Sequence, residues 1–242
     1  MNKKIIFIFV FVFVVMSNYS FSQGSGAFSI SGGPIFGWNI PQINDLNSEL
    51  KKIGYPQIST AGQFVVGGAG YMEIPVNFGL KIGGMGMGFS TDISSESQNT
   101  IQAVSLKYTM GGISVEYVKK ISKKFDYTLG SIIGIGSFGF KIHKYPKDYQ
   151  YWNISNFGID TAGNNNVLTN DYSKTLYIFQ PQIGIGYQLT NFLYLKLNAG
   201  YMLTFSDEWK INEILEVKNV PSGIKADGFS FLLGLNFGLF PN

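Results

Sequence analysis

The clearest structural signal in the chain is residues 228–240, which read Gly-Phe-Ser-Phe-Leu-Leu-Gly-Leu-Asn-Phe-Gly-Leu-Phe. Large apolar side chains take every second position from Phe229 to Leu239, while Ser230 and Asn236 take positions between them. A two-residue period places alternate side chains on opposite faces of a β-strand. The apolar face carries no charge, so the pattern predicts a strand with an apolar medium on one side and a more polar space on the other.

The two segments before this one repeat the pattern. In 192–205, leucines alternate with Tyr194, Lys196 and Asn198, and in 175–189 aromatic and branched residues alternate with glutamines. A water-soluble sheet would put its charged residues on the outside. Here the charged or amide face is the better candidate for the inside.

Similar segments recur along the chain, separated by polar stretches. No later segment suggests a second domain. We count eight predicted strands: 28–37, 62–74, 77–91, 103–118, 125–142, 175–189, 192–205 and 228–240.

The connections between these segments alternate between short and longer. Up-and-down barrels of the bacterial outer membrane have short periplasmic turns and longer external loops, so this alternation favours such a barrel over a Greek-key sandwich. In chain order, the predicted connections are 38–61, 75–76, 92–102, 119–124, 143–174, 190–191 and 206–227.

The third and fourth predicted strands change phase in their middles. We expect β-bulges at Gly83-Gly84 and Gly111-Gly112 to absorb the change. With that correction, five charged residues point into a packed polar interior, since eight strands enclose room for side chains and not for an open channel. They are Glu73, Lys81, Lys107, Glu116 and Lys196.

Composition excludes several functions. The chain has no Cys and one His, which rules out thiolate metal sites and His clusters, and we expect no cofactor and no bound metal. All basic residues are lysines, and without Lys3 and Lys4 the formal charge is close to neutral, so no nucleic-acid partner is expected.

Residues 1–22 have the features of a cleaved secretory signal peptide. Lys3 and Lys4 precede an apolar run from Ile5 to Met16, which is too short for a membrane-spanning helix. Residues 23–242 then form a single predicted domain. Because that domain has no comparable apolar run, any membrane span must use strands.

The long connections hold the candidate contact residues. Ile43, Leu46, Leu50 and Ile53 share one face of a predicted short helix within 41–53. The stretch 206–227 is rich in apolar residues for an exposed loop, so the loops pack on one another or form a groove for an apolar ligand or a protein partner. We expect the loops 38–61, 143–174 and 206–227 to make any external contacts.

His143 is the single candidate base for an enzyme. A lipid A-modifying barrel would need a serine near it, and Ser137, Ser155 and Ser173 are the candidates. An ordinary surface histidine fits the sequence better. The Gly134-Ile-Gly-Ser-Phe-Gly139 stretch matches a dinucleotide fingerprint, but no helix can follow it before Pro146, so we interpret it as a glycine-rich strand.

As a whole, the predicted mature chain resembles the small eight-stranded outer-membrane barrels of Gram-negative bacteria, the group that includes the OmpA membrane domain, OmpX and OmpW. The resemblance is one of strand pattern, and Phe240 is followed by Pro241 and Asn242 where such barrels usually end in an aromatic residue. It implies an all-β, eight-stranded antiparallel up-and-down transmembrane β-barrel with one short helix in its first long loop, located in the cell outer membrane.

The resemblance also implies partners. They are outer-membrane lipids and lipopolysaccharide, the outer-membrane assembly machinery, and an extracellular partner at the loops. We expect a non-enzymatic structural or surface-interaction role. Two alternatives stay open at this stage: a narrow, porin-like conduit or binding barrel for small apolar molecules, and a lipid A-modifying enzyme using His143.

Overall fold

A computed structural model describes residues 29–74, 79–96, 99–147 and 168–240. The predicted signal peptide lies outside these residues. The described chain is all-β and antiparallel, with one helix, α2, at Asn44–Lys52. Its strands are β1 Ser29–Gln42, β2 Gln63–Ile74, β3 Leu80–Glu96, β4 Thr100–Lys120, β5 Phe125–Pro146, β6 Leu168–Gln188, β7 Leu193–Ser206, β8 Trp209–Ile211, β9 Leu215–Val217 and β10 Lys225–Leu239.

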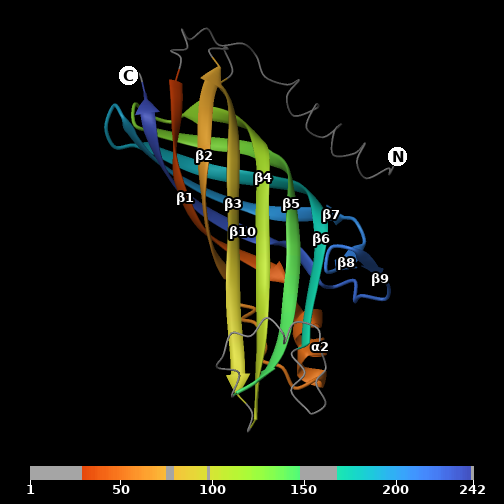
Figure 1. Cartoon of the computed structure of the whole chain (residues 1–242). Coiled ribbons are helices and arrows are strands. Elements are labelled where there is room, and N and C mark those ends of the chain that lie inside the picture. Colours follow the sequence, from red (N-terminus) through yellow and green to blue (C-terminus); the bar gives the residue numbers. More distant parts are fainter. Residues whose placement is uncertain (1–28, 75–78, 97–98, 148–167, 241–242) are drawn as a thin grey trace.

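The eight long strands pair in an up-and-down order and close into a ring (Figure 1). Each strand from β1 to β6 pairs with the next in sequence, β7 pairs with β10, and β10 pairs with β1 to complete the circuit. The predicted antiparallel, up-and-down arrangement is therefore confirmed. No helix in the described part of the chain is long and apolar enough to cross a bilayer.

The ring has two different ends. At the short-turn end, uppermost in Figure 1, connections of only a few residues join β2 to β3, β4 to β5 and β6 to β7. At the loop end lie α2 and the connection that carries β8 and β9. The predicted alternation fails once: 92–102 is not a loop, because β3 and β4 extend to a connection of only 97–99.

The other predicted loops are also shorter than expected. β1 runs on to Gln42, β5 runs to Pro146 and β6 begins at Leu168, so parts of 38–61 and 143–174 are strand. These added residues lie at the loop end. Strands β3 to β6 therefore project beyond the rest of the ring, as the lower half of Figure 1 shows for β3 and β4.

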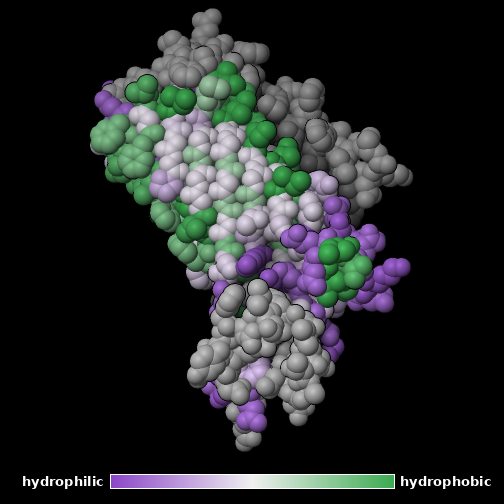
Figure 2. Space-filling model, viewed as in Figure 1, coloured by the Kyte–Doolittle hydropathy of each residue, from purple (hydrophilic) through white to green (hydrophobic). Residues whose placement is uncertain are grey.

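The outer wall at the short-turn half is apolar, as the alternation in β6, β7 and β10 predicted. Figure 2 shows one face of the outer wall as green and pale surface, with the purple side chains gathered toward the loop end. The more exposed wall residues include Phe64, Ile113, Ile133, Ile135, Ile183, Ile185, Phe229, Phe231 and Phe237, each exposing about half of its side chain or more.

The predicted bulges at Gly83-Gly84 and Gly111-Gly112 are absent. The β3–β4 register is continuous from Leu80 opposite Tyr117 to Glu96 opposite Ile101. Lys107 consequently points outward and is exposed, and its predicted inward placement is wrong. The apolar residues of β4 switch from even to odd positions because the inner side of the strand is apolar near the loop end, whereas its outer side is apolar near the short-turn end. The pairing itself does not change.

The interior near the short-turn end is polar, and most of the predicted inward charges are there. Lys196 is 1 % exposed and forms an ion pair with Glu116, which is also 1 % exposed. Gln182 donates its Nε2–H to Glu116 at 3.0 Å, and the Lys196 ammonium lies 4.3 Å from the centre of the Tyr71 ring. We call Glu116, Lys196, Gln182 and Tyr71 the polar layer.

Glycine makes room for large side chains in this interior. Tyr194 is buried and donates its hydroxyl hydrogen to Asp126 at 2.6 Å. A Cβ at Gly186 would lie 1.7 Å from that hydroxyl oxygen. The absence of a side chain at Gly186 therefore lets Tyr194 point inward.

Toward the loop end the interior becomes apolar. Buried residues from four strands meet there, and the Tyr108 hydroxyl contacts the Met202 sulfur at 2.9 Å. The apolar layer comprises Leu106, Tyr108, Phe138, Leu176, Ile178 and Met202. The Gly134–Gly139 stretch is an uninterrupted part of β5, as we predicted.

Candidate loop pocket

Helix α2 covers the loop end of the ring with the face that the sequence predicted. Ile43, Leu46 and Leu50 are almost fully buried, while Ile53 remains 55 % exposed. The helix ends at Lys52, and Gly54, two residues later, has a φ of +76°, a conformation that glycine adopts at little cost. Its predicted start was slightly early, because residues 41 and 42 belong to β1.

The connection from β7 to β10 forms a small hairpin of its own. β8 pairs with β9, and β8 also pairs with the edge of β6 through Ile211 opposite Tyr172. The hairpin turns at Asn212 and Glu213, whose φ angles of 50° and 62° fit a type I′ turn. Sequence reasoning treated 206–227 as a loop and missed both strands.

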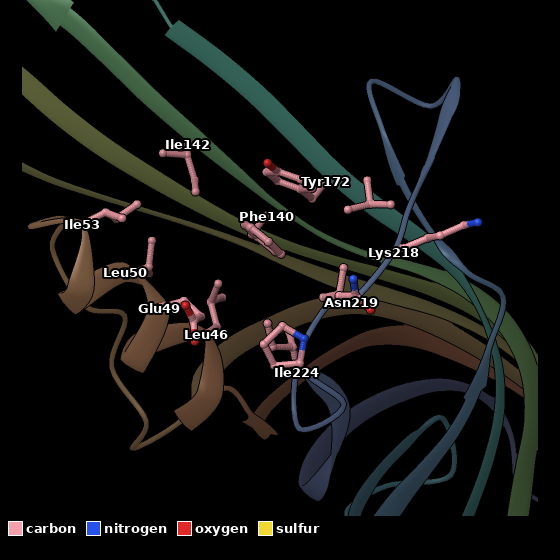
Figure 3. Close-up of a pocket in the computed structure, with 13 residues that line it drawn as sticks. Leu46, Glu49, Leu50, Ile53, Phe140, Ile142, Tyr172, Lys218, Asn219 and Ile224 are labelled. Carbon is pink, nitrogen blue, oxygen red and sulfur yellow. The ribbon is translucent and has the colours of Figure 1, made fainter.

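Three predicted contact segments meet in one apolar pocket, shown in Figure 3. α2 supplies one wall, the ends of β5 and β6 supply a second, and the stretch after β9 supplies a third. The cavity volume is about 210 Å³. Its lining residues are Leu46, Glu49, Leu50, Ile53, Phe140, Ile142, Tyr172, Val217, Lys218, Asn219, Val220, Pro221 and Ile224.

A cluster of aromatic rings forms one side of this loop pocket. Phe140 and Tyr172 stack with ring centres 4.8 Å apart and an interplanar angle of 21°. Behind them, Trp209 meets Phe140 edge-on at 5.4 Å. Aromatic pairs in these geometries stabilise each other beyond their buried area, so this side of the pocket is well packed.

Hydrogen bonds hold two of the other walls in place. Asn47 on α2 donates its Nδ2–H to the Ile58 carbonyl at 2.7 Å and accepts the Ile58 N–H at 2.8 Å. Lys174 donates to the Ile224 carbonyl at 3.1 Å, with its ammonium 4.7 Å from the Trp209 ring centre. These bonds tie α2 to the segment that precedes β2, and tie the stretch after β9 to β6.

Charged side chains stand at the rim. Glu49 forms an ion pair with Lys52 at 2.6 Å, and both side chains are about half exposed or more. Lys218 extends its ammonium away from the other lining residues in Figure 3. The lining itself is dominated by aliphatic and aromatic side chains.

The structure does not bring His143 together with a described serine. His143 Nδ1 lies 3.1 Å from the Thr169 hydroxyl oxygen. Ser137 is six residues away on β5, roughly 20 Å at about 3.3 Å per residue. Ser173 lies on β6 opposite Gly139, four residues along the strand from the Thr169 that pairs with His143, and Ser155 lies outside the described residues. Partial burial, and next the nearby Lys141, lower the pKa of His143, which favours the neutral ring at pH 7.

Metal ligands do not gather in the described part of the chain. No group of three His, Asp or Glu side chains there could hold an ion. Asp171 forms an ion pair with Lys141 at 2.6 Å, while Asp148 and Asp160 lie outside the described residues.

Comparison with known proteins finds structural neighbours but no sequence relative. No family model matches the chain, and no curated protein matches it. The crystal structure of Ail, the attachment invasion locus protein of Yersinia pestis, in complex with the heparin analogue sucrose octasulfate, aligns with 88 % of this chain and 97 % of that chain. The two are 12 % identical with a TM-score of 0.35, which assigns no function to this chain.

Proposed function

We propose that this chain is an outer-membrane β-barrel protein with a non-enzymatic structural or surface-interaction role. The observation that carries the proposal is that apolar side chains lie on the outer wall of the ring and charged side chains lie inside it, the reverse of a water-soluble protein. Phe231 and Ile183 point outward, while Lys196 and Glu116 are buried inside. Such a reversal is favourable when hydrocarbon surrounds the ring, and unfavourable in water.

The loop end faces the outside of the cell in this proposal. Strands β1 and β10 both reach the short-turn end, where Ile30 pairs with Leu239. Tight turns and both chain ends lie on the periplasmic side of bacterial barrels, and longer connections lie outside. The loop pocket, α2 and the β8–β9 hairpin would then be available for surface contacts.

Lipids are the partners of the outer wall. Phe125 and Tyr187 pack against each other at the short-turn end with ring centres 4.5 Å apart, a position suited to the membrane interface. A hollow of about 910 Å³ on the outer wall includes Phe36, Trp38 and Phe231 in its lining and fits acyl chains of membrane lipid or lipopolysaccharide. Recognition of Phe240 by the assembly machinery and cleavage of residues 1–22 remain parts of the proposal.

We do not propose the lipid A enzyme. The Thr169 hydroxyl is the hydrogen-bond partner of the single histidine, His143, and the described candidate serines, Ser137 and Ser173, lie several residues away along β5 and β6. We also do not propose an open conduit, because the apolar layer fills the ring between its two ends.

Single-cysteine variants test the location and orientation, since the natural chain has no Cys. We choose Ile214→Cys in the β8–β9 turn, Lys123→Cys in the β4–β5 turn and Ile183→Cys on the outer wall, all at exposed positions. In intact cells a membrane-impermeant maleimide should label Ile214→Cys alone. Lys123→Cys should react only after the outer membrane is opened, and Ile183→Cys only after denaturation.

Two results would refute the proposal. One is release of the protein from the envelope by alkaline wash without detergent. The other is labelling of Ile183→Cys in intact membranes as fast as Ile214→Cys, which would mean that water and not lipid surrounds the outer wall.

A further inference from the structure

We infer that the loop pocket binds a small, uncharged, apolar molecule of about the size of a single aromatic ring. The inference depends on the proposed function in one respect only, namely that the pocket faces the outside of the cell. Its other premises are the volume, lining and stiffness of the pocket itself.

The volume sets the size of the ligand. An apolar cavity of about 150 Å³ lined by Leu, Ile and Phe stays dry and takes up benzene. The loop pocket has about 210 Å³ and a lining of the same kind. A substituted benzene therefore fits, whereas a two-chain lipid does not.

The lining sets the polarity of the ligand. Ring faces and aliphatic side chains are contributed by Phe140, Tyr172, Leu46 and Ile224, and these surfaces favour apolar groups. The carboxylate of Glu49 is already paired with Lys52 at the rim. The Lys218 ammonium points away from the other lining residues, so a charged ligand would lose hydration inside the pocket without gaining a partner there.

The stiffness of the walls explains why the pocket stays open. An apolar hollow tends to collapse unless its surroundings are held apart, because collapse would remove apolar surface from water. The bonds between Asn47 and Ile58 fix the chain beneath α2. The bond from Lys174, whose ammonium lies over the Trp209 ring, holds the Ile224 backbone. A preformed site avoids the ordering cost that a flexible loop would incur on binding.

The test uses the full chain in lipid nanodiscs, with p-xylene as the probe and carbon-13 methyl labels on Ile, Leu and Val. Ring currents from a bound ring should shift the Leu46, Ile142 and Ile224 methyl signals, and the shifts should saturate. Outer-wall methyls such as those of Ile133 should shift only in proportion to the p-xylene dissolved in the lipid.

Two matched variants separate the pocket from general partitioning. Ile53 lines the pocket at a half-exposed position, so Ile53→Trp should fill the pocket without disturbing the core and weaken binding at least tenfold. Ile214 lies outside the pocket and is 80 % exposed, so Ile214→Trp should leave the affinity unchanged. Benzoate, which has the same ring and a negative charge, should bind at least tenfold more weakly than p-xylene.

Absence of saturable shifts at the pocket methyls would overturn the inference, as would unchanged binding in Ile53→Trp or equal affinity for benzoate. The labelling experiment reports separately on the membrane location. If p-xylene binds saturably but the surface labelling fails, the ligand site is supported and the orientation is refuted. If the labelling succeeds but saturable binding is absent, only the ligand site is refuted.

Discussion

At the scale of single residues, the most informative contact is the ion pair of Lys196 and Glu116 within the polar layer. Both side chains are about 1 % exposed, and Gln182 supplies a further hydrogen bond to the carboxylate. A buried charge is tolerable when its partner is present and becomes costly when the partner is removed. The pair therefore constrains which substitutions the interior can accept.

Replacing Lys196 by Met should reduce the free energy of unfolding by about 3–5 kcal/mol, because Glu116 is then left buried without a countercharge. Urea titration of the protein folded in lipid vesicles measures the change. The double variant Lys196→Met, Glu116→Gln should recover at least half of the loss.

The exposed pair of Lys52 and Glu49 provides the control. Lys52→Met should change stability by less than about 1 kcal/mol, as is usual for surface ion pairs. Equal losses in Lys196→Met and Lys52→Met would contradict the importance of the buried pair.

At the scale of elements, β4 passes from one environment to another while keeping one register. Ile113 and Lys107 point to the same side of the strand, six residues apart, and both are exposed. Inside, Glu116 lies toward the short-turn end and Tyr108 toward the loop end, both fully buried. The outer face changes from apolar to polar where the inner face changes from polar to apolar, as expected if the strand leaves the membrane near Gly111.

Ile113→Lys should lower the stability of the folded protein in bilayers by about 2–4 kcal/mol if residue 113 lies near the membrane midplane, and by less if it lies near the interface. Lys107→Ile, on the same face, should change it by less than about 1 kcal/mol, because this position lies in water. Vesicle unfolding measures both. A larger loss for Lys107→Ile than for Ile113→Lys would reverse our placement of β4.

At the scale of the whole molecule, the two interior layers close the ring. The polar layer fills the short-turn half, and the apolar layer, with Tyr108 and Met202 in contact, fills the part toward the loops. An eight-stranded ring has just enough interior for its own side chains. Helix α2 and the loops then cover the loop end.

Planar-bilayer recordings should therefore show no steady ion conductance from the purified protein, because ions cannot cross the apolar layer without losing their hydration. A preparation of a known trimeric porin in the same lipid provides the positive control. Regular, step-like conductance that scales with the amount of folded protein would show that the interior opens.

Much of the fold could be predicted because its signals are local. The alternation in residues 228–240 identified the outward face of β10, and the spacing of Ile43, Leu46 and Leu50 identified the buried face of α2. The inward placements of Lys81, Glu116 and Lys196 are confirmed as well. These predictions needed only the periods of strand and helix and the cost of an isolated charge in an apolar medium.

The pocket was less predictable. The apolar residues in 206–227 indicated a groove or packed loops, but nothing in the sequence paired Phe140 with Tyr172 or placed either beside α2. Likewise, a phase change at Gly111-Gly112 is compatible with a bulge or with a change of surroundings, and we predicted the bulge.

The sequence by itself determined which residues avoid water and with what period, since each strand or helix carries that information in its own side chains. Only the tertiary structure decided the register of β3 against β4, the outward position of Lys107, and the meeting of three distant segments around one pocket. The physical reason is that these features depend on pairing and packing between segments far apart in the chain. Their free energy is realised only when the ring closes.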